Sequence, residues 1–180
     1  MDTLNRFQAG FSTGVEYTIL QTKANLIATL SKLGVNEECL TIQREVYAGF
    51  TRINGPLDQS TLLSGLNLAN TLNTLEHFTE ARSLLSNLIP KFQGACGNDH
   101  QATLSARCMF ASILMGGHTP NPPEGVSLDD VREAAEILED CSRRVRRVLG
   151  VDHPNYGLFK ERLDDANRRL KLMLARAPTA

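Results

Sequence analysis

The sequence predicts an all-α fold, a solenoid of stacked antiparallel helix pairs with about three and a half repeats in 180 residues. Composition is the first observation, because the chain is rich in Leu, has no Trp and is only 6% aromatic, which is typical of helical proteins. The other observations are a helical spacing of apolar residues and an internal repeat. A lone helix pair cannot bury its apolar face, so neighbouring pairs must stack.

The repeat has a period of 42 residues in the first part of the chain. Residues 25–30 (NLIATL) align with residues 67–72 (NLANTL) at that offset. The same offset places Gly55 on Gly97 and Asp58 on His100. Two copies of one structural unit are therefore expected in succession.

A third copy follows with a longer spacing. Residues 80–85 (EARSLL) align with residues 133–138 (EAAEIL) at an offset of 53. The additional residues fall near GGHTPNPPEGV, whose Gly and Pro content predicts a loop insertion at 116–127. The predicted division is a partial repeat at 1–12, repeats at 13–54, 55–96 and 97–149, and a C-terminal capping helix within 150–180.

Each unit contains two segments with apolar residues at i, i+3 and i+4, the period of an amphipathic helix. In the first segment of the second unit Gly65 and Ala69 are small, which allows two helices to approach closely. The phase of the repeat also predicts a short helix before residue 12. The other predicted helices span residues 15–33, 36–53, 58–76, 78–95, 100–116, 128–149 and 154–176.

The stretch CGNDHQATLSARC raises the question of a metal site or a catalytic pair at Asp99 and His100. The repeat favours a structural interpretation, in which Gly97 ends one helix and Asn98 or Asp99 caps the next. One His and one carboxylate on a turn do not make a metal site without ligands from other segments. We therefore predict no metal, no cofactor and no catalytic residue.

The motif LGVDHPNYG at residues 149–157, together with NLANTL and EAAEIL, resembles the 42-residue tetratricopeptide repeats of kinesin light chains and related proteins. The resemblance implies a right-handed superhelix that serves as a protein-binding scaffold. It covers roughly residues 13 to 176. The chain departs from the Asn-Asn-Leu-Ala pattern of these repeats, because only the second Asn is present, at Asn25 and Asn67.

The resemblance also implies that the first helix of each pair lines a concave groove. This surface is neutral apart from Lys32, and Asn amides offer both a donor and an acceptor to a peptide backbone. We expect an extended and largely neutral peptide or helix as the ligand. The alternative is a solvated or merely structural face. The predicted groove residues are Asn25, Lys32, Leu66, Asn67, Asn70, Asn73, Cys108, Met109 and Ser112.

Charge and targeting features exclude several classes of protein. The formal net charge is −1, so no basic field favours nucleic-acid binding. No apolar run approaches the ~20 residues of a membrane span, and the first residues do not resemble a signal peptide. We expect a cytoplasmic protein, with the nucleus as the alternative, and reduced cysteines.

The run SRRVRRVLG at residues 142–150 has two interpretations. Acidic residues open this predicted helix and arginines end it, which complements the helix dipole. Alternatively, the arginines form a surface for an acidic partner, extended by Arg168, Arg169 and Lys171.

The predicted function is a protein–protein interaction scaffold and not an enzyme. One alternative is an oligomerising or regulatory segment of a larger protein, and another is an accessory domain of an enzyme whose catalytic domain is absent. The N-terminal end lacks a charged cap, so we expect it to offer a surface for weak self-association.

Overall fold

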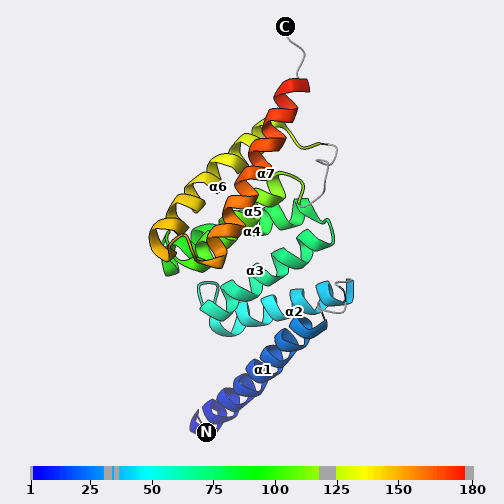
Figure 1. Cartoon of the computed structure of the whole chain (residues 1–180). Helices are drawn as coiled ribbons and strands as arrows, with labels where there is room; N and C mark the ends of the chain where they lie inside the picture. Colours follow the sequence, from blue (N-terminus) through cyan, green and yellow to red (C-terminus); the bar gives the residue numbers. More distant parts are fainter. Residues whose placement is uncertain (1, 31–33, 35–36, 118–124, 177–180) are drawn as a thin grey trace. The chain divides into compact units, whose positions relative to one another are not determined.

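The computed structural model describes residues 2–30, 34, 37–117 and 125–176. Over these residues the chain forms seven α-helices and no β-strand, which confirms the predicted all-α class (Figure 1). The helices are α1 (Asp2–Leu30), α2 (Glu37–Asn54), α3 (Gln59–Thr74), α4 (Phe78–Cys96), α5 (Gln101–Leu114), α6 (Leu128–Leu149) and α7 (Pro154–Arg176).

Helices that follow one another in the chain pack against one another, in two compact units. In the unit Met1–Leu75, α2 contacts both α1 and α3. In the unit Glu76–Ala180, α4 contacts α5, α5 contacts α6 and α6 contacts α7. This succession is consistent with a solenoid of helix pairs. The border between the units lies inside the predicted repeat 55–96, and the repeat boundaries stay a prediction.

The first helix differs from its prediction. The separate helix expected before residue 12 is wrong, because α1 continues without a break from Asp2 to Leu30. Gly10 and Gly14 each cost a helix about 1 kcal/mol relative to Ala, and no proline accompanies them, so the helix continues through them. The expected helix end at residues 31–33 and most of the loop insertion lie outside the described residues.

The first unit is held together by a small apolar core between α1 and α2. Leu20 of α1 lies against Gly49 of α2, where an added Cβ would come within 2.6 Å of Leu20 Cδ1. The rings of Tyr17 and Phe50 meet edge to face with centroids 5.5 Å apart. Glycine at position 49 therefore allows the two helices to approach closely. The buried members of this core are Leu20, Ile27, Cys39, Val46 and Phe50.

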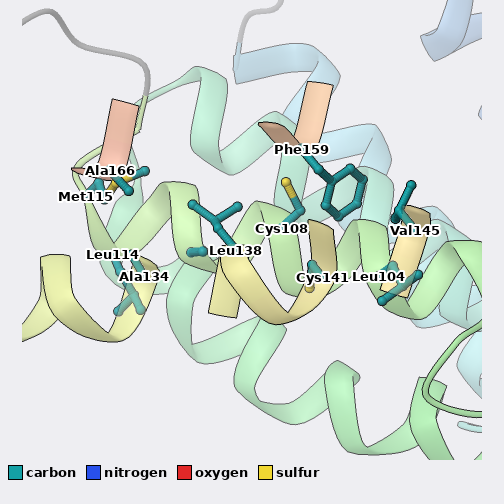
Figure 2. Close-up of a cluster of buried hydrophobic side chains, with 11 residues drawn as sticks. Leu104, Cys108, Leu114, Met115, Ala134, Leu138, Cys141, Val145, Phe159 and Ala166 are labelled. Atoms are coloured by element: carbon teal, nitrogen blue, oxygen red, sulfur yellow. The ribbon is translucent and has the colours of Figure 1, made fainter. Parts of the chain in front are cut away.

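The second unit has a larger core, to which α5, α6 and α7 all contribute (Figure 2). In this view the Phe159 ring of α7 lies between Cys108 of α5 and Val145 of α6. Phe159 is only 2% exposed, and burial of such a side chain stabilises the fold by about 1.5–3 kcal/mol. Cys141 of α6 is fully buried in the same core.

The turns before α3 and α5 show why the repeat carries glycine. Gly55 and Gly97 have φ angles of 87° and 89°, a conformation that side chains with a Cβ disfavour. The N-cap three residues later is Asp58 in one turn and His100 in the other. The predicted capping residue of α5 is wrong, because His100, and neither Asn98 nor Asp99, accepts the backbone N–H of Ala102.

Candidate interaction surface

The exposed face of α3 carries four of the predicted groove residues. Helix α3 begins where the Asp58 carboxylate accepts the N–H groups of Ser60 and Thr61, at 2.8 and 3.3 Å. Its other side is buried and includes Leu62, Leu68 and Leu72. Residues spaced by three or four positions share one helix face. The structure thus brings together Leu66, Asn67, Asn70 and Asn73.

The four residues differ in how far they are exposed. Asn67 and Asn70 are exposed, and neither side chain bonds to another described residue. Leu66 is half-buried beside the 40% exposed Leu63. Asn73 is half-buried, and its Oδ1 is buried without a hydrogen-bond partner among the described residues. The accessible part of this face is therefore an amide strip, Asn67 and Asn70, with leucines beside it.

The predicted groove residues of the first helix are only partly described. Asn25 is exposed on α1 and makes no side-chain hydrogen bond to a described residue. Lys32 lies outside the described residues. One residue of the predicted surface on α1 is thus accessible to a partner.

On α5, helix α7 covers part of the predicted groove. Cys108 and Ser112 are 5% and 1% exposed, and only Met109 is half-buried. Arg162 of α7 donates a hydrogen bond to Ser112 Oγ at 2.8 Å. The expectation that a peptide reaches Cys108 and Ser112 is therefore wrong in this structure, since the last helix packs on that face.

Burial also determines the chemistry of Cys108. It raises the pKa of the Cys108 thiol to about 11, so the group stays protonated at neutral pH. A protonated and buried thiol is a poor nucleophile. Cys108 is a packing residue of the core in Figure 2.

A second polar feature, which we call the arginine cluster, lies on α5, α6 and the turn between α4 and α5. Arg144 joins its two carboxylates, because its Nε donates to Asp140 at 2.7 Å and its Nη1 donates to Asp99 at 2.8 Å. Arg147 donates to the other oxygen of Asp99 at 2.6 Å. The cluster consists of Arg107, Arg143, Arg144, Arg146 and Arg147 with Asp99 and Asp140.

These contacts lower the pKa of both carboxyl groups. The hydrogen bond from Arg144 is the largest cause for Asp99, and it holds the pKa of that carboxyl below its ordinary value. Partial burial alone would raise the pKa of Asp140, but the hydrogen bonds from Arg144 and Arg107 outweigh it and lower the pKa. Both groups are therefore carboxylates at neutral pH.

Sequence reasoning missed the role of Asp99. The spacing of Asp140 to Arg143 and Arg144 on one helix predicts local ion pairs. The contact between Asp99 and Arg144 spans 45 positions and depends on how α6 packs in the second unit. The sequence holds one signal for this contact. Asp99 is an acidic residue on a turn with no partner nearby in the sequence, and the arginines at residues 143–147 end a later helix.

The predicted extension of the basic patch onto α7 is wrong for Arg169. This residue is 6% exposed, and its Nη1 donates to the Met115 carbonyl at 2.7 Å. Its Nε donates to Asp165 at 2.9 Å. Arg169 fastens α7 to the end of α5. Arg168 is exposed, but it also binds Asp165.

The described part of the chain offers neither a metal site nor a membrane-spanning helix. Among these residues no three His, Cys, Asp or Glu side chains converge as a metal site would require. None of the described helices combines the length and the apolar character needed to cross a bilayer.

Comparison with known proteins identifies one repeat. Residues 126–155 match the model of a family described as tetratricopeptide repeat. This segment contains α6 and the turn that leads into α7. The match supports a tetratricopeptide-like repeat at this place, where α6 and α7 pack against each other. The comparison with curated proteins gave no match.

Proposed function

We propose that the chain is a protein-interaction scaffold, and that it binds a peptide or helix of a partner along α3. The observation that carries this proposal is the amide strip of Asn67 and Asn70, exposed opposite the buried side of the helix. Tetratricopeptide repeats generally mediate binding between proteins, and the match at residues 126–155 supports the same role here.

The chemistry of the strip fits the backbone of an extended peptide. An Asn amide donates through its nitrogen and accepts through its oxygen, so it satisfies both polar groups of one peptide unit. Leu63 is 40% exposed beside the strip and offers apolar contact to a partner side chain. Asn25 on α1 carries the same chemistry as Asn67 at the equivalent repeat position and is part of the proposal.

The test is capture of partners by the intact chain and by the double variant Asn67→Ala/Asn70→Ala. Each lost hydrogen bond is worth about 0.5–1.5 kcal/mol, so capture should weaken about tenfold. The matched control is Asn87→Ala/Asn98→Ala, which removes two exposed amides outside α3. Equal capture by both double variants would argue against a site on α3.

The type of repeat and the cellular location are proposed from the resemblance of the sequence. We propose repeats of the kinesin-light-chain-like type and a cytoplasmic location. The proposal includes no catalytic role, because tetratricopeptide repeats generally serve as interaction domains.

A second candidate, oligomerisation, is favoured by the exposed face of α1. Val15, Ile19 and Leu26 are 46%, 51% and 50% exposed. The hydroxyl groups of Thr18 and Thr22 on this helix donate to backbone carbonyls four residues earlier, so these polar groups are satisfied within the helix. A concentration-dependent dimer, lost in Ile19→Glu, would support this candidate over a monomeric scaffold.

A further inference from the structure

The arginine cluster holds more positive than negative charge, and part of that charge faces solvent. The cluster has five guanidinium groups, and four of them, from Arg107, Arg143, Arg144 and Arg147, share the carboxylates of Asp99 and Asp140. Glu139 is the nearest other carboxylate along α6, and it forms no ion pair with a described residue. The cluster remains positive even when Glu139 is counted.

The members of the cluster divide into an inner and an outer set. The side chains of Arg107 and Arg144 are 17% and 30% exposed and bind the two carboxylates at 2.7–2.8 Å. The side chains of Arg143 and Arg147 are 73% and 66% exposed. Arg146 is exposed and forms no ion pair within the described part of the chain. The inner set fixes the turn to α6. The outer set is exposed to a partner, although Arg143 and Arg147 also pair with Asp140 and Asp99.

We infer that Arg143, Arg146 and Arg147 form a docking surface for an acidic peptide segment of a partner protein. This inference rests on the proposal that the chain binds other proteins. Guanidinium groups bind carboxylates with strong, charge-assisted hydrogen bonds, and the cluster already does so with its own Asp99. Charge complementarity is therefore the reason for choosing an acidic peptide as the partner of this surface.

The spacing of the outer arginines suits an extended segment. Arg143 and Arg147 are one helical turn apart, which corresponds to about 6 Å along the axis. Alternate residues of an extended peptide are about 6.6 Å apart and point to the same side. A segment with Glu or Asp at every second position therefore places one carboxylate on each arginine.

Nucleic acid fits the same surface less well. Binding to single strands commonly combines basic groups with aromatic side chains that stack on bases. The outer arginines lie on a helix that has no aromatic residue, between Leu128 and Leu149. The net charge of −1 also gives no long-range attraction for a polyanion.

The test uses the intact chain and a fluorescein-labelled decapeptide of alternating Ser and Glu, with Gln replacing Glu in the control peptide. Binding is measured by fluorescence anisotropy at about 50 mM NaCl, where screening is weak. The variant Arg143→Gln/Arg146→Gln keeps the bonds of Arg144, Arg147 and Arg107 to the two carboxylates. The matched control Arg132→Gln/Arg168→Gln removes the same charge from two exposed arginines elsewhere.

The expected result is that the Glu peptide binds, the Gln peptide does not, and the variant binds about three- to tenfold more weakly. The control should change binding less than twofold. Equal losses in both double variants, or no binding of the Glu peptide, would overturn the inference. Tighter binding of a single-stranded DNA oligonucleotide, lost in the same variant, would assign the surface to nucleic acid instead. Partner capture through Asn67 and Asn70 is measured in a separate experiment. Failure of the peptide test would therefore leave the proposed site on α3 standing.

Discussion

Asp99 and Arg144 are joined by a hydrogen bond of 2.8 Å across 45 positions of the chain. The bond links the turn before α5 to the end of α6. Arg144 also binds Asp140 at 2.7 Å, so one guanidinium ties together a turn and a helix. The aspartate that resembled part of a metal or catalytic site is thus an anchor for the packing of two helices.

Asp140→Asn should destabilise the second unit at neutral pH. The substitution removes the charge that faces Arg107 and Arg144, and loss of such bonds costs about 1–3 kcal/mol. Urea unfolding monitored by circular dichroism measures the change. Asp129→Asn is the control, because that carboxylate is 89% exposed and pairs only along its own helix.

The effect of Asp140→Asn should depend on pH in a defined direction. The folded-state pKa of Asp140 is lowered, so its stabilisation is complete above the unfolded-state pKa of about 3.9. The stabilisation disappears as the pH falls through the lower, folded-state value. The difference between wild type and variant should therefore shrink in acid, and an undiminished difference there would contradict the ionic account.

Substitutions at the two N-cap residues should have different effects on the free energy of unfolding. Asp58→Ala removes the acceptor of two N–H groups and should lower the free energy of unfolding by about 1 kcal/mol. His100→Asp introduces the residue of the equivalent position and should maintain or raise stability, since His100 accepts only one such bond. Thermal melts of the two variants measure this, and a stabilised Asp58→Ala protein would refute the capping role.

The four cysteines should differ in their reaction with a thiol reagent. Burial raises the pKa of Cys141 to about 12 and that of Cys108 to about 11, and Cys39 is also buried. Cys96 is half-buried and should react first. Mass spectrometry after brief labelling near pH 7.5 identifies the modified residue. Rapid labelling of Cys108 in the folded protein would contradict the covering of α5 by α7.

Treatment with a chelator should leave the helical circular dichroism and the melting temperature unchanged. The expectation rests on Asp99 and His100, which bond to Arg144 and to the backbone of Ala102. A large drop in melting temperature would reveal a structural metal, because metal binding contributes directly to folding.

The helical class and most helix bounds followed from the sequence, because apolar periodicity and repeated glycines are local signals. Helices α4, α6 and α7 begin at their predicted residues. The separate helix predicted before residue 12 is absent, because α1 continues through Gly10 and Gly14. Two glycines without a proline do not end a helix. Local pattern also placed the cap of α5 at Asn98 or Asp99, whereas the structure has it at His100.

The candidate surface was predictable only in part. Asn67 and Asn70 share a helix face by spacing alone, and the structure leaves both exposed. The covering of Ser112 depends on where α7 packs, through Arg162 and the buried Phe159. Such contacts join residues about fifty positions apart, and no local pattern in the sequence encodes them.

The central claim, that the chain binds a partner along α3, is tested most directly with one captured partner and the variant Asn67→Ala/Asn70→Ala. Titration calorimetry should give a dissociation constant about tenfold higher than wild type, which corresponds to ~1.4 kcal/mol. The melting temperature should stay nearly unchanged, because both amides are exposed. A variant that binds as tightly as wild type, or one that unfolds, would contradict the account.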